Sequence, residues 1–459
     1  MRTSTIGHRV DLIKQKFRHS LGLPFRTVLP EQLFEAALRA EGITWRKRLF
    51  SPAVTVWAFL SQVVDQDNRC ATAVSRVIAW LAAEDQPLPS PDPSAYCQAR
   101  QRLSEGLLCR LLHTVSDRLQ AQVSRRQWWQ GHRVFLVDGS TTLLPDTPEN
   151  QAAYPQHANQ AEGCGFPLAR FVCLFSLDTA AVQDVQIGSY HTHELTLARP
   201  LYQPLQPGDV VMGDSLFCTY VDIAQLQAQG VAVVFCMHGA RTVDFRRGQK
   251  LGRHDHLVEW TKPRYPPPGL SPQQFARLPD NLRLRELRYT IQPQGGRAKK
   301  ITLATTFLDP STYSKQTLAT LFARRWEAEL DLRHLKTTLG MEMLTTQTPE
   351  MIRKELLAHL LAYNLIRSLL WDASQKYAVD PLRLSLQNAL RQLRYFLPEL
   401  AHASARRRHR LYDRLLSIIA RQVVPKRTRP SQPRMRKRRP KPFPLMKKPS
   451  AASRRKHAA

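Results

Sequence analysis

Two aspartates each follow a short apolar run, a placement that suits metal-dependent chemistry. In the segment RVFLVDG the apolar run ends at Asp138, and in DVVMGDS the run VVMG ends at Asp214. A continuous apolar run indicates a strand buried on both faces, and open α/β sheets bind ligands beyond the carboxyl ends of their strands. Two carboxylates that meet there repel each other unless a cation neutralises them, and their hard oxygens suit Mg²⁺. Taken singly, each aspartate is explained more simply as a turn former or a helix cap.

A third carboxylate, that of Glu329, lies in a segment with helical periodicity. The pattern predicts a single helix over 316–340, which a terminal glycine ends. At about 100° per residue, Phe322, Arg325, Glu329 and Lys336 fall on one stripe beside the apolar face of this helix. The same wheel turns two other acids to the opposite side, Glu327 and Asp331.

A surface ion pair with Arg333, four residues further on, is the simpler explanation of Glu329. Such a pair contributes only about 0.2–0.5 kcal/mol. It explains Glu329 alone and leaves the two cations of the stripe, Arg325 and Lys336, without a reason. We therefore expect one carboxylate and two cations at the edge of the face that docks on the core.

The elements that must position these residues form an α/β centre between two helical regions. From about residue 131, short apolar runs predict strands, with helical patterns at 193–205 and 220–229 between them. Residues 239–301 break this rhythm with two Arg/Lys clusters and the strand-like run LRLRELRYTI, so we interpret them as an insertion. The chain before the centre is helical, starting with a helix that Pro30 opens. Three further helical segments follow the centre: 348–373, 380–397 and 405–422.

Composition and charge exclude several classes of protein. The chain has 459 residues and a formal net charge of +30, so a polyanionic partner is expected, nucleic acid first. Seven cysteines without a C-x-x-C pair argue against a disulfide framework or a structural zinc site. The richest apolar stretch, 356–371, contains His, Asn and Arg, which disfavours a membrane span, and the N-terminus lacks the apolar core of a secretory signal. These features predict a soluble intracellular protein.

The C-terminal residues 421–459 form a basic tail. They contain 15 Lys and Arg residues and no Asp or Glu. Such a segment cannot bury apolar surface, so we expect disorder. Its role is either that of a non-specific nucleic-acid arm, which the absence of acids favours, or that of a solvated tail that aids solubility.

The stripe also carries a family resemblance. The spacing Phe322-x2-Arg325-x3-Glu329-x6-Lys336 resembles the Tyr-(2)-Arg-(3)-Glu-(6)-Lys signature of the insertion-sequence-four family of DDE transposases. The two aspartates match that family's first two acidic blocks. PSAYCQARQRL, DFRRGQKLGRHDHLVEW and TPEMIRKELLAHLLAYNLIR also look like family segments, so the resemblance covers roughly residues 30–400. One position departs: Phe322 stands where the family has Tyr, which keeps the ring and loses a hydroxyl donor.

For the fold, the resemblance implies an α/β protein with an RNase H-like catalytic domain, a β-rich insertion, and helical regions on both sides. The expected divisions are a helical N-terminal DNA-binding region at 1–125, the first part of the catalytic domain at 126–238, a basic β-rich insertion at 239–301, the second part with the glutamate-bearing helix at 302–345, a C-terminal helical region that we expect to dimerise at 346–420, and the disordered basic tail at 421–459.

For the activity, the resemblance implies a DNA transposase that binds terminal inverted repeats and catalyses metal-dependent strand cleavage and strand transfer. Asp138, Asp214 and Glu329 would hold two Mg²⁺ ions, with Mn²⁺ as a substitute, for in-line phosphoryl transfer. Arg325 and Lys336 would contact phosphates of the DNA end. The partners would be double-stranded DNA, at the repeats and at the target, and a second copy in a synaptic complex, with no membrane. The expected location is the bacterial cytoplasm, with nucleoid association when DNA is bound.

Other residues offer weaker signals, each with a structural alternative. Arg100 and Arg102 either bind terminal repeats or form surface ion pairs, and Trp260 either stacks on a flipped base or packs in the core. We also expect Phe322 to lie among the residues that bind DNA. A basic run in the insertion either tracks the DNA backbone or forms a solvated face: Arg241, Arg246, Arg247, Lys250 and Arg253. The segment YHTHEL resembles a metal-ligand set but is better explained structurally: His191, His193 and Glu194.

Two other functions compete with the transposase. Another RNase H-like nuclease would keep the three acids but would have no reason for the Arg325, Glu329 and Lys336 spacing. A DNA-binding relic without catalysis would keep the basic charge, although the intact acids argue against decay. Metal-dependent strand cleavage separates these classes, whereas DNA binding alone does not.

Overall fold

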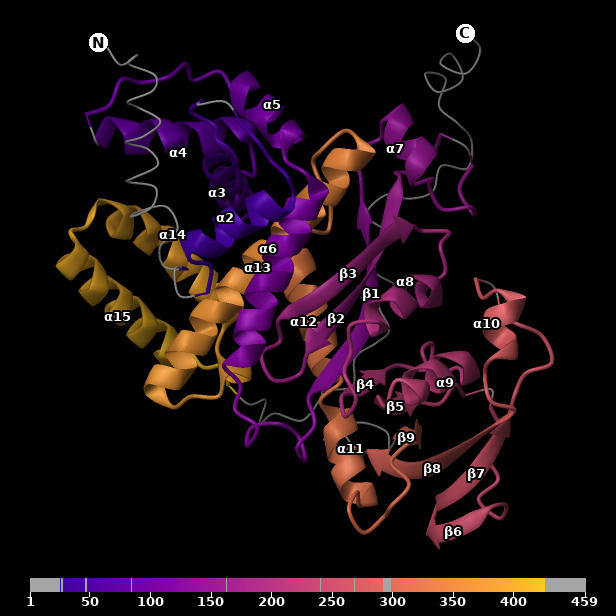
Figure 1. The fold of residues 1–459 in the computed structure, drawn as a ribbon. Coiled ribbons are helices and arrows are strands. Elements are labelled where there is room, and N and C mark those ends of the chain that lie inside the picture. The colour runs from indigo at the N-terminus through magenta and orange to yellow at the C-terminus, as the bar shows by residue number, and fades with distance from the viewer. Residues whose placement is uncertain are drawn as a thin grey trace, which may run out of the picture. The chain divides into compact units, whose positions relative to one another are not determined.

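The computed structural model describes residues 25, 28–45, 48–83, 85–161, 163–239, 241–267, 269–291 and 299–425. They fall into two compact units, coloured by residue number in Figure 1. The helical unit comprises residues up to 123, a short segment at 179–183, and 333–424. The sheet unit comprises 124–178 and 184–332. The basic tail expected at 421–459 lies outside the described residues beyond 425.

A nine-stranded sheet organises the sheet unit, and its spatial order is β3-β2-β1-β4-β5-β9-β8-β7-β6. The strands β1, β4 and β5 run parallel, whereas β2 joins β1 and β9 joins β5 in antiparallel fashion. The expected strands are confirmed, and the residues interpreted as an insertion continue the same sheet. The bounds are β1 Val134–Leu143, β2 Leu168–Ser176, β3 Val182–Ser189, β4 Val210–Gly213, β5 Ala232–Cys236, β6 Gln249–Gly252, β7 Asp255–Thr261, β8 Asn281–Ile291 and β9 Lys299–Thr305.

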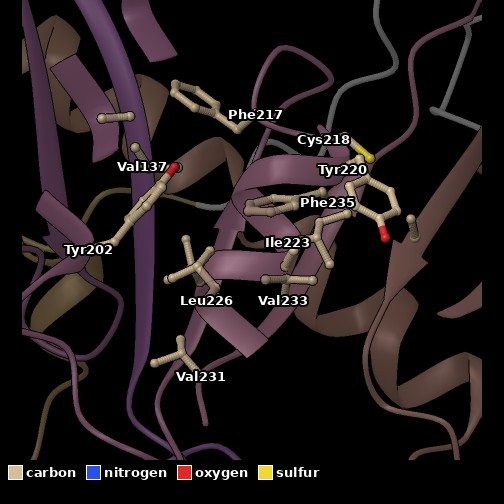
Figure 2. Close-up of a cluster of buried hydrophobic side chains, with 14 of the residues drawn as sticks. Val137, Tyr202, Phe217, Cys218, Tyr220, Ile223, Leu226, Val231, Val233 and Phe235 are labelled. Atoms are coloured by element: carbon tan, nitrogen blue, oxygen red, sulfur yellow. The ribbon is translucent and has the colours of Figure 1, made fainter. Parts of the chain in front are cut away.

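Helices α8 (Glu194–Tyr202) and α9 (Tyr220–Ala228) contribute to the main core of this unit. Their apolar side chains pack with those of β1, β4 and β5 in the cluster that Figure 2 shows. Val211, Val233 and Phe235 are completely buried there. Full burial of such a side chain contributes about 1.5–3 kcal/mol, so this core fixes the strands on which the two aspartates lie.

The helical unit is built around one long helix, α13 (Pro349–Tyr377), most of whose surface is buried. Thr348 caps its N-terminus, as the Thr-Pro-Glu start signal predicts. Its Asn364 side chain exchanges two hydrogen bonds of 2.8 Å with the backbone of Val182. The neighbouring helices are α2 Glu31–Ala40, α3 Pro52–Val63, α4 Cys70–Ala83, α5 Ser94–Arg102, α6 Glu105–Ala121, α14 Leu386–His402 and α15 Ala405–Arg421. No described helix has the length and apolar character needed to cross a membrane.

A buried ion pair ties the outer strands of the sheet to the chain that follows it. Arg285 of β8 is fully buried and forms a two-pronged pair with Asp255 of β7, at 2.8 and 2.6 Å. Its remaining nitrogen Nη1 donates to the carbonyl oxygen of Tyr313 at 2.6 Å. The pair therefore links β7 and β8 to Tyr313, two residues before helix α11 (Lys315–Ala323).

We predict that Arg285→Met lowers the free energy of unfolding by about 3–5 kcal/mol, because it leaves the Asp255 carboxylate buried without its partner. The double variant Asp255→Leu/Arg285→Met removes both charges and recovers most of this loss. Denaturant unfolding of the two variants beside the wild type measures both effects. Equal stability of the single and double variants would contradict the prediction.

Candidate active site

Asp138 and Asp214 lie at the same edge of the sheet. The parallel pairing of β1 with β4 ends at Leu136 opposite Met212, and each aspartate lies two residues further on. One detail differs from expectation, because β1 does not end at Asp138. It continues to Leu143 since β2 keeps pairing with it on the other side, with Asp138 opposite Cys173. Of the two strands, only β4 ends here, so β1 has no β4 residues beside it beyond this point.

Both carboxylates are oriented by backbone N–H groups. The N–H of Gly139 donates to Oδ1 of Asp138, and the N–H of Leu216 donates to Oδ1 of Asp214, each at 2.8 Å. The bond to Leu216, two residues on, is the turn contact that an isolated aspartate typically makes. Asp214 is therefore a turn former, as the simpler explanation predicts. The same hydrogen bond fixes its carboxylate just beyond the end of β4.

Electrostatics at this edge favour a cation. The pKa of Asp138 is raised to about 6; burial is the main cause and the charges of Asp214 and Glu194 add to the rise, whereas the Gly139 N–H and Arg325 oppose it. Burial and like charges disfavour the ionised form of a carboxyl, and a bound divalent cation stabilises that ionised form. The oxygen donors present thus fit a hard metal ion such as Mg²⁺.

The glutamate-bearing segment is not the single helix that its periodicity predicts. It consists of α11 (Lys315–Ala323), α12 (Trp326–Arg333) and a π-helical turn at His334–Thr338. Arg324 and Arg325 form a turn whose N–H groups bond three residues back, to Leu321 and Phe322. Arg324 also pairs with Glu327 at 3.0 Å and donates to the distant carbonyl of Leu177 at 3.2 Å. These contacts stabilise the break between α11 and α12. Because the helix is interrupted, the angles of a single helical wheel do not apply to the residues that follow the break.

The predicted stripe is accordingly redistributed. Phe322 is only 5% exposed, and the Arg325 guanidinium lies over its ring and over the ring of Trp326, 5.8 and 5.2 Å from the centroids. Glu329 is partly buried on α12, and Lys336 lies in the π-helical turn. Asp331, which the wheel turned outward, is buried.

Among the described residues, no group of three or more His, Cys, Asp or Glu side chains has the geometry of a metal site. The charges of Asp214 and Arg325 both act on Asp138, so these three side chains lie close together, but the described residues do not form a three-carboxylate metal group with Glu329. The histidines of the YHTHEL segment do not form a site either. His193 caps α8 by accepting from Leu195, and His191 bonds the carbonyl oxygen of Gln156.

Two further residues expected at the DNA are buried, as Phe322 is. Arg100 is 8% exposed, bonds Gln62 Oε1 at 3.1 Å and stacks on the Phe59 ring, so its role in this state is structural. Trp260 is 6% exposed and donates its indole N–H to Glu286 at 2.7 Å. Its ring also carries the Arg241 guanidinium 3.7 Å from the centroid. Both side chains are thus engaged by partners within the protein, whereas Arg102 is exposed.

Sequence reasoning missed the role of Glu194 beside the aspartates. A Cβ atom placed on Gly139 would lie 3.3 Å from the Glu194 carboxyl group, so this acid approaches the residue that follows Asp138. Arg170 of β2 holds it at 3.5 Å. The only signal in the sequence is the glycine after Asp138, which permits this close approach.

Comparison with known proteins identifies the class. The family model "Transposase DDE domain" matches residues 129–365, and "Insertion element 4 transposase N-terminal" matches residues 19–113. The chain therefore belongs to the insertion-sequence-four (IS4) family of DDE transposases. The strand order and the flanking helices agree with the RNase H-like fold of that class.

Individual transposases are similar to this chain. The chain is 28% identical to the transposase InsG for insertion sequence element IS4 of Escherichia coli K12, over 97% of this chain and 99% of InsG. It is 25% identical to the putative transposase InsZ of the same organism, over 38% of this chain and 56% of InsZ. A cryo-EM structure of the piggyBac transposase synaptic complex with hairpin DNA is similar over 89% of this chain and 86% of that chain, with 12% identity and a TM-score of 0.43.

We predict that Gly213→Ala reduces DNA cleavage strongly while DNA binding persists. Its Cβ would lie 3.0 Å from side-chain atoms of both Phe217 and Val137, so these side chains or the turn that carries Asp214 must give by a few tenths of an ångström. A displacement of about 1 Å at a reacting centre lowers rates by about 10²-fold, so we expect a loss of up to about this size. Gly252→Ala is the matched control, since its nearest neighbour, Asp255, is 4.0 Å away. Cleavage of an end-sequence duplex by the two variants tests this, and equal activities would contradict it.

Proposed function

We propose that this insertion-sequence transposase cleaves and joins DNA at a centre formed by Asp138, Asp214 and Glu329 around Mg²⁺. The observation that supports it best is the convergence of the two aspartates from neighbouring parallel strands at an edge where their charges are poorly compensated. DDE transposases generally use divalent metal ions. Two Mg²⁺ ions, with Mn²⁺ as a substitute, would activate the attacking oxygen and stabilise the leaving oxygen.

The remaining groups then position DNA. Arg325 lies close enough to lower the pKa of Asp138, so its guanidinium would hold a phosphate oxygen of the strand to be cut. Lys336 would add a second phosphate contact as a point charge. Phe322 would act indirectly, because its ring packs against the Arg325 guanidinium and helps to position it.

Glu329 would join the aspartates when DNA binds. Its helix α12 is bounded by irregular backbone on both sides, the turn at Arg324 and Arg325 and the π-helical turn at 334–338. Mid-helix irregularities of this kind often mark functional hinges. A small rotation of α12 about these two points would carry the third carboxylate toward the other two.

The substrate class follows from the family, because a transposase binds DNA. The duplexes bound would be the terminal inverted repeats and the target, with the exposed Arg102 of α5 among the contacts at the repeats. A dimer would hold both ends in a synaptic complex. The protein would act in the bacterial cytoplasm, at the nucleoid when bound to DNA.

We predict that Glu329→Gln abolishes strand cleavage in Mg²⁺ while affinity for the end duplex stays within about threefold, since one neutral amide cannot replace a metal-ligand carboxylate. Glu327→Gln is the matched control two residues away, because the amide oxygen can still accept from Arg324, so the turn is kept and cleavage should stay largely intact. A gel assay of nicking and a binding titration on the same duplex measure both properties.

The same assay distinguishes the competing functions. Binding by the wild type without cleavage in Mg²⁺ or Mn²⁺ would indicate a DNA-binding relic. Cleavage without joining, and without preference for end sequence, would indicate another RNase H-like nuclease. Cleavage by Glu329→Gln at the wild-type rate would exclude Glu329 from the centre.

A further inference from the structure

Cationic side chains gather around the tight turn between β6 and β7. Lys315, the first residue of α11, donates from Nζ to the carbonyl oxygens of Arg253 and His254 at 2.7 and 3.4 Å. The backbone N–H of Arg288 on β8 bonds the His254 carbonyl at 2.9 Å. Three separate elements of the sheet unit therefore meet at this turn, in the region of α11, β6, β7 and β8 in Figure 1.

A further lysine extends the group along the sheet. In the antiparallel pairing of β8 with β9, Arg288 lies opposite Thr302 and Thr290 lies opposite Lys300. Arg288 and Lys300 are thus diagonal neighbours on one face, about 7–8 Å apart at the backbone. We call Arg253, His254, Arg288, Lys300 and Lys315 the basic cluster.

The charged groups that act on His254 are all cations, whereas Lys315 also feels the negative charge of Asp255. Loss of hydration lowers the pKa of His254, and the four cations of the cluster lower it further. The nearest acid in the sequence, Asp255, is occupied by its two bonds to Arg285. The four cations of the basic cluster therefore lie close enough to His254 to disfavour its charged form.

The rest of the basic run expected to track the DNA backbone, from 241 to 250, is different from Arg253, which belongs to the basic cluster. Arg241 covers the Trp260 ring, while Arg246 and Arg247 pair with Asp244 at 2.9 and 3.6 Å. Hydrogen bonds from Arg246 hold the pKa of Asp244 down, to about 2. Part of the charge of this run is thereby neutralised within the protein, whereas the basic cluster keeps its charge for an external anion.

Parts of the basic cluster are also fixed before any ligand binds. Arg288 donates from Nε to Thr302 Oγ1 at 2.9 Å, and its guanidinium lies 4.9 Å from the Phe245 ring centroid. Lys315 is held by its two carbonyl partners. Less side-chain freedom is lost when such groups bind an anion, which favours binding.

We propose that the basic cluster binds backbone phosphates of duplex DNA, independently of base sequence. This inference rests on the proposed function, because it assigns part of the transposase's DNA contact to this surface. Lys315 opens the helix that leads to Arg325, so DNA held here lies against the element that precedes the candidate active site. The cluster positions DNA, and sequence recognition belongs to other residues.

The test measures DNA affinity by fluorescence anisotropy over a series of salt concentrations, with the full-length protein and two duplexes, one with the end sequence and one arbitrary. The variant Arg253→Gln/Lys300→Gln removes two exposed charges of the basic cluster. If each contacts one phosphate, the slope of log affinity against log salt falls in magnitude by about 1.8. The loss of affinity should be equal for the two duplexes.

Arg246→Gln/Arg247→Gln removes the same charge from the Asp244 pairs and is the matched control, with a clearly smaller change in slope. Equal changes in both double variants, or no change in the first, would overturn the inference. Thermal unfolding of both variants checks that the sheet unit is intact. Failure of the wild type to cleave the end duplex would overturn the proposed function instead, since the salt slope does not depend on cleavage.

Discussion

Two carboxylates held at one edge of a sheet repel each other, and the sheet unit maintains them there nevertheless. Val137, next to Asp138, and Phe217, three residues after Asp214, are both anchored in the main core. The pair therefore cannot separate without disturbing that core. Arg325 compensates part of the charge, yet the pKa of Asp138 remains raised. Strongly perturbed acids of this kind cluster at functional sites, where the charge that they lack is supplied by what they bind.

The elements of this fold follow from local sequence, because their signals are local. Buried strands follow from continuous apolar runs, and the start of α13 follows from Thr348 and Pro349. The break in the glutamate-bearing segment could not be predicted, since its helical periodicity is unbroken. It depends on Arg324, whose partner Leu177 lies far away in the chain. The continuation of β1 beyond Asp138 depends in the same way on its pairing with β2.

The candidate site was predictable in part for the same reason. The neighbourhood of Asp138 and Asp214 follows from two similar strand ends, but the burial of Arg100 and Trp260 does not follow from their types. Arginine and tryptophan bind DNA and also pack together in protein cores, so only their partners decide the role. Those partners, such as Gln62 for Arg100 and Glu286 for Trp260, are 38 and 26 residues away in sequence.

The segment interpreted as an insertion, residues 239–301, forms part of the nine-stranded sheet. Its strands β6, β7 and β8 join the central strands through β9, which bonds both β8 and β5. Excision of 239–301 would remove β6, β7, β8 and the first three residues of β9, and the rest of β9 would become an unpaired strand edge, which invites aggregation. The segment is therefore no detachable module. Its loops and surface charges can vary, while its backbone ladder must be kept because it pairs the outer side of β9.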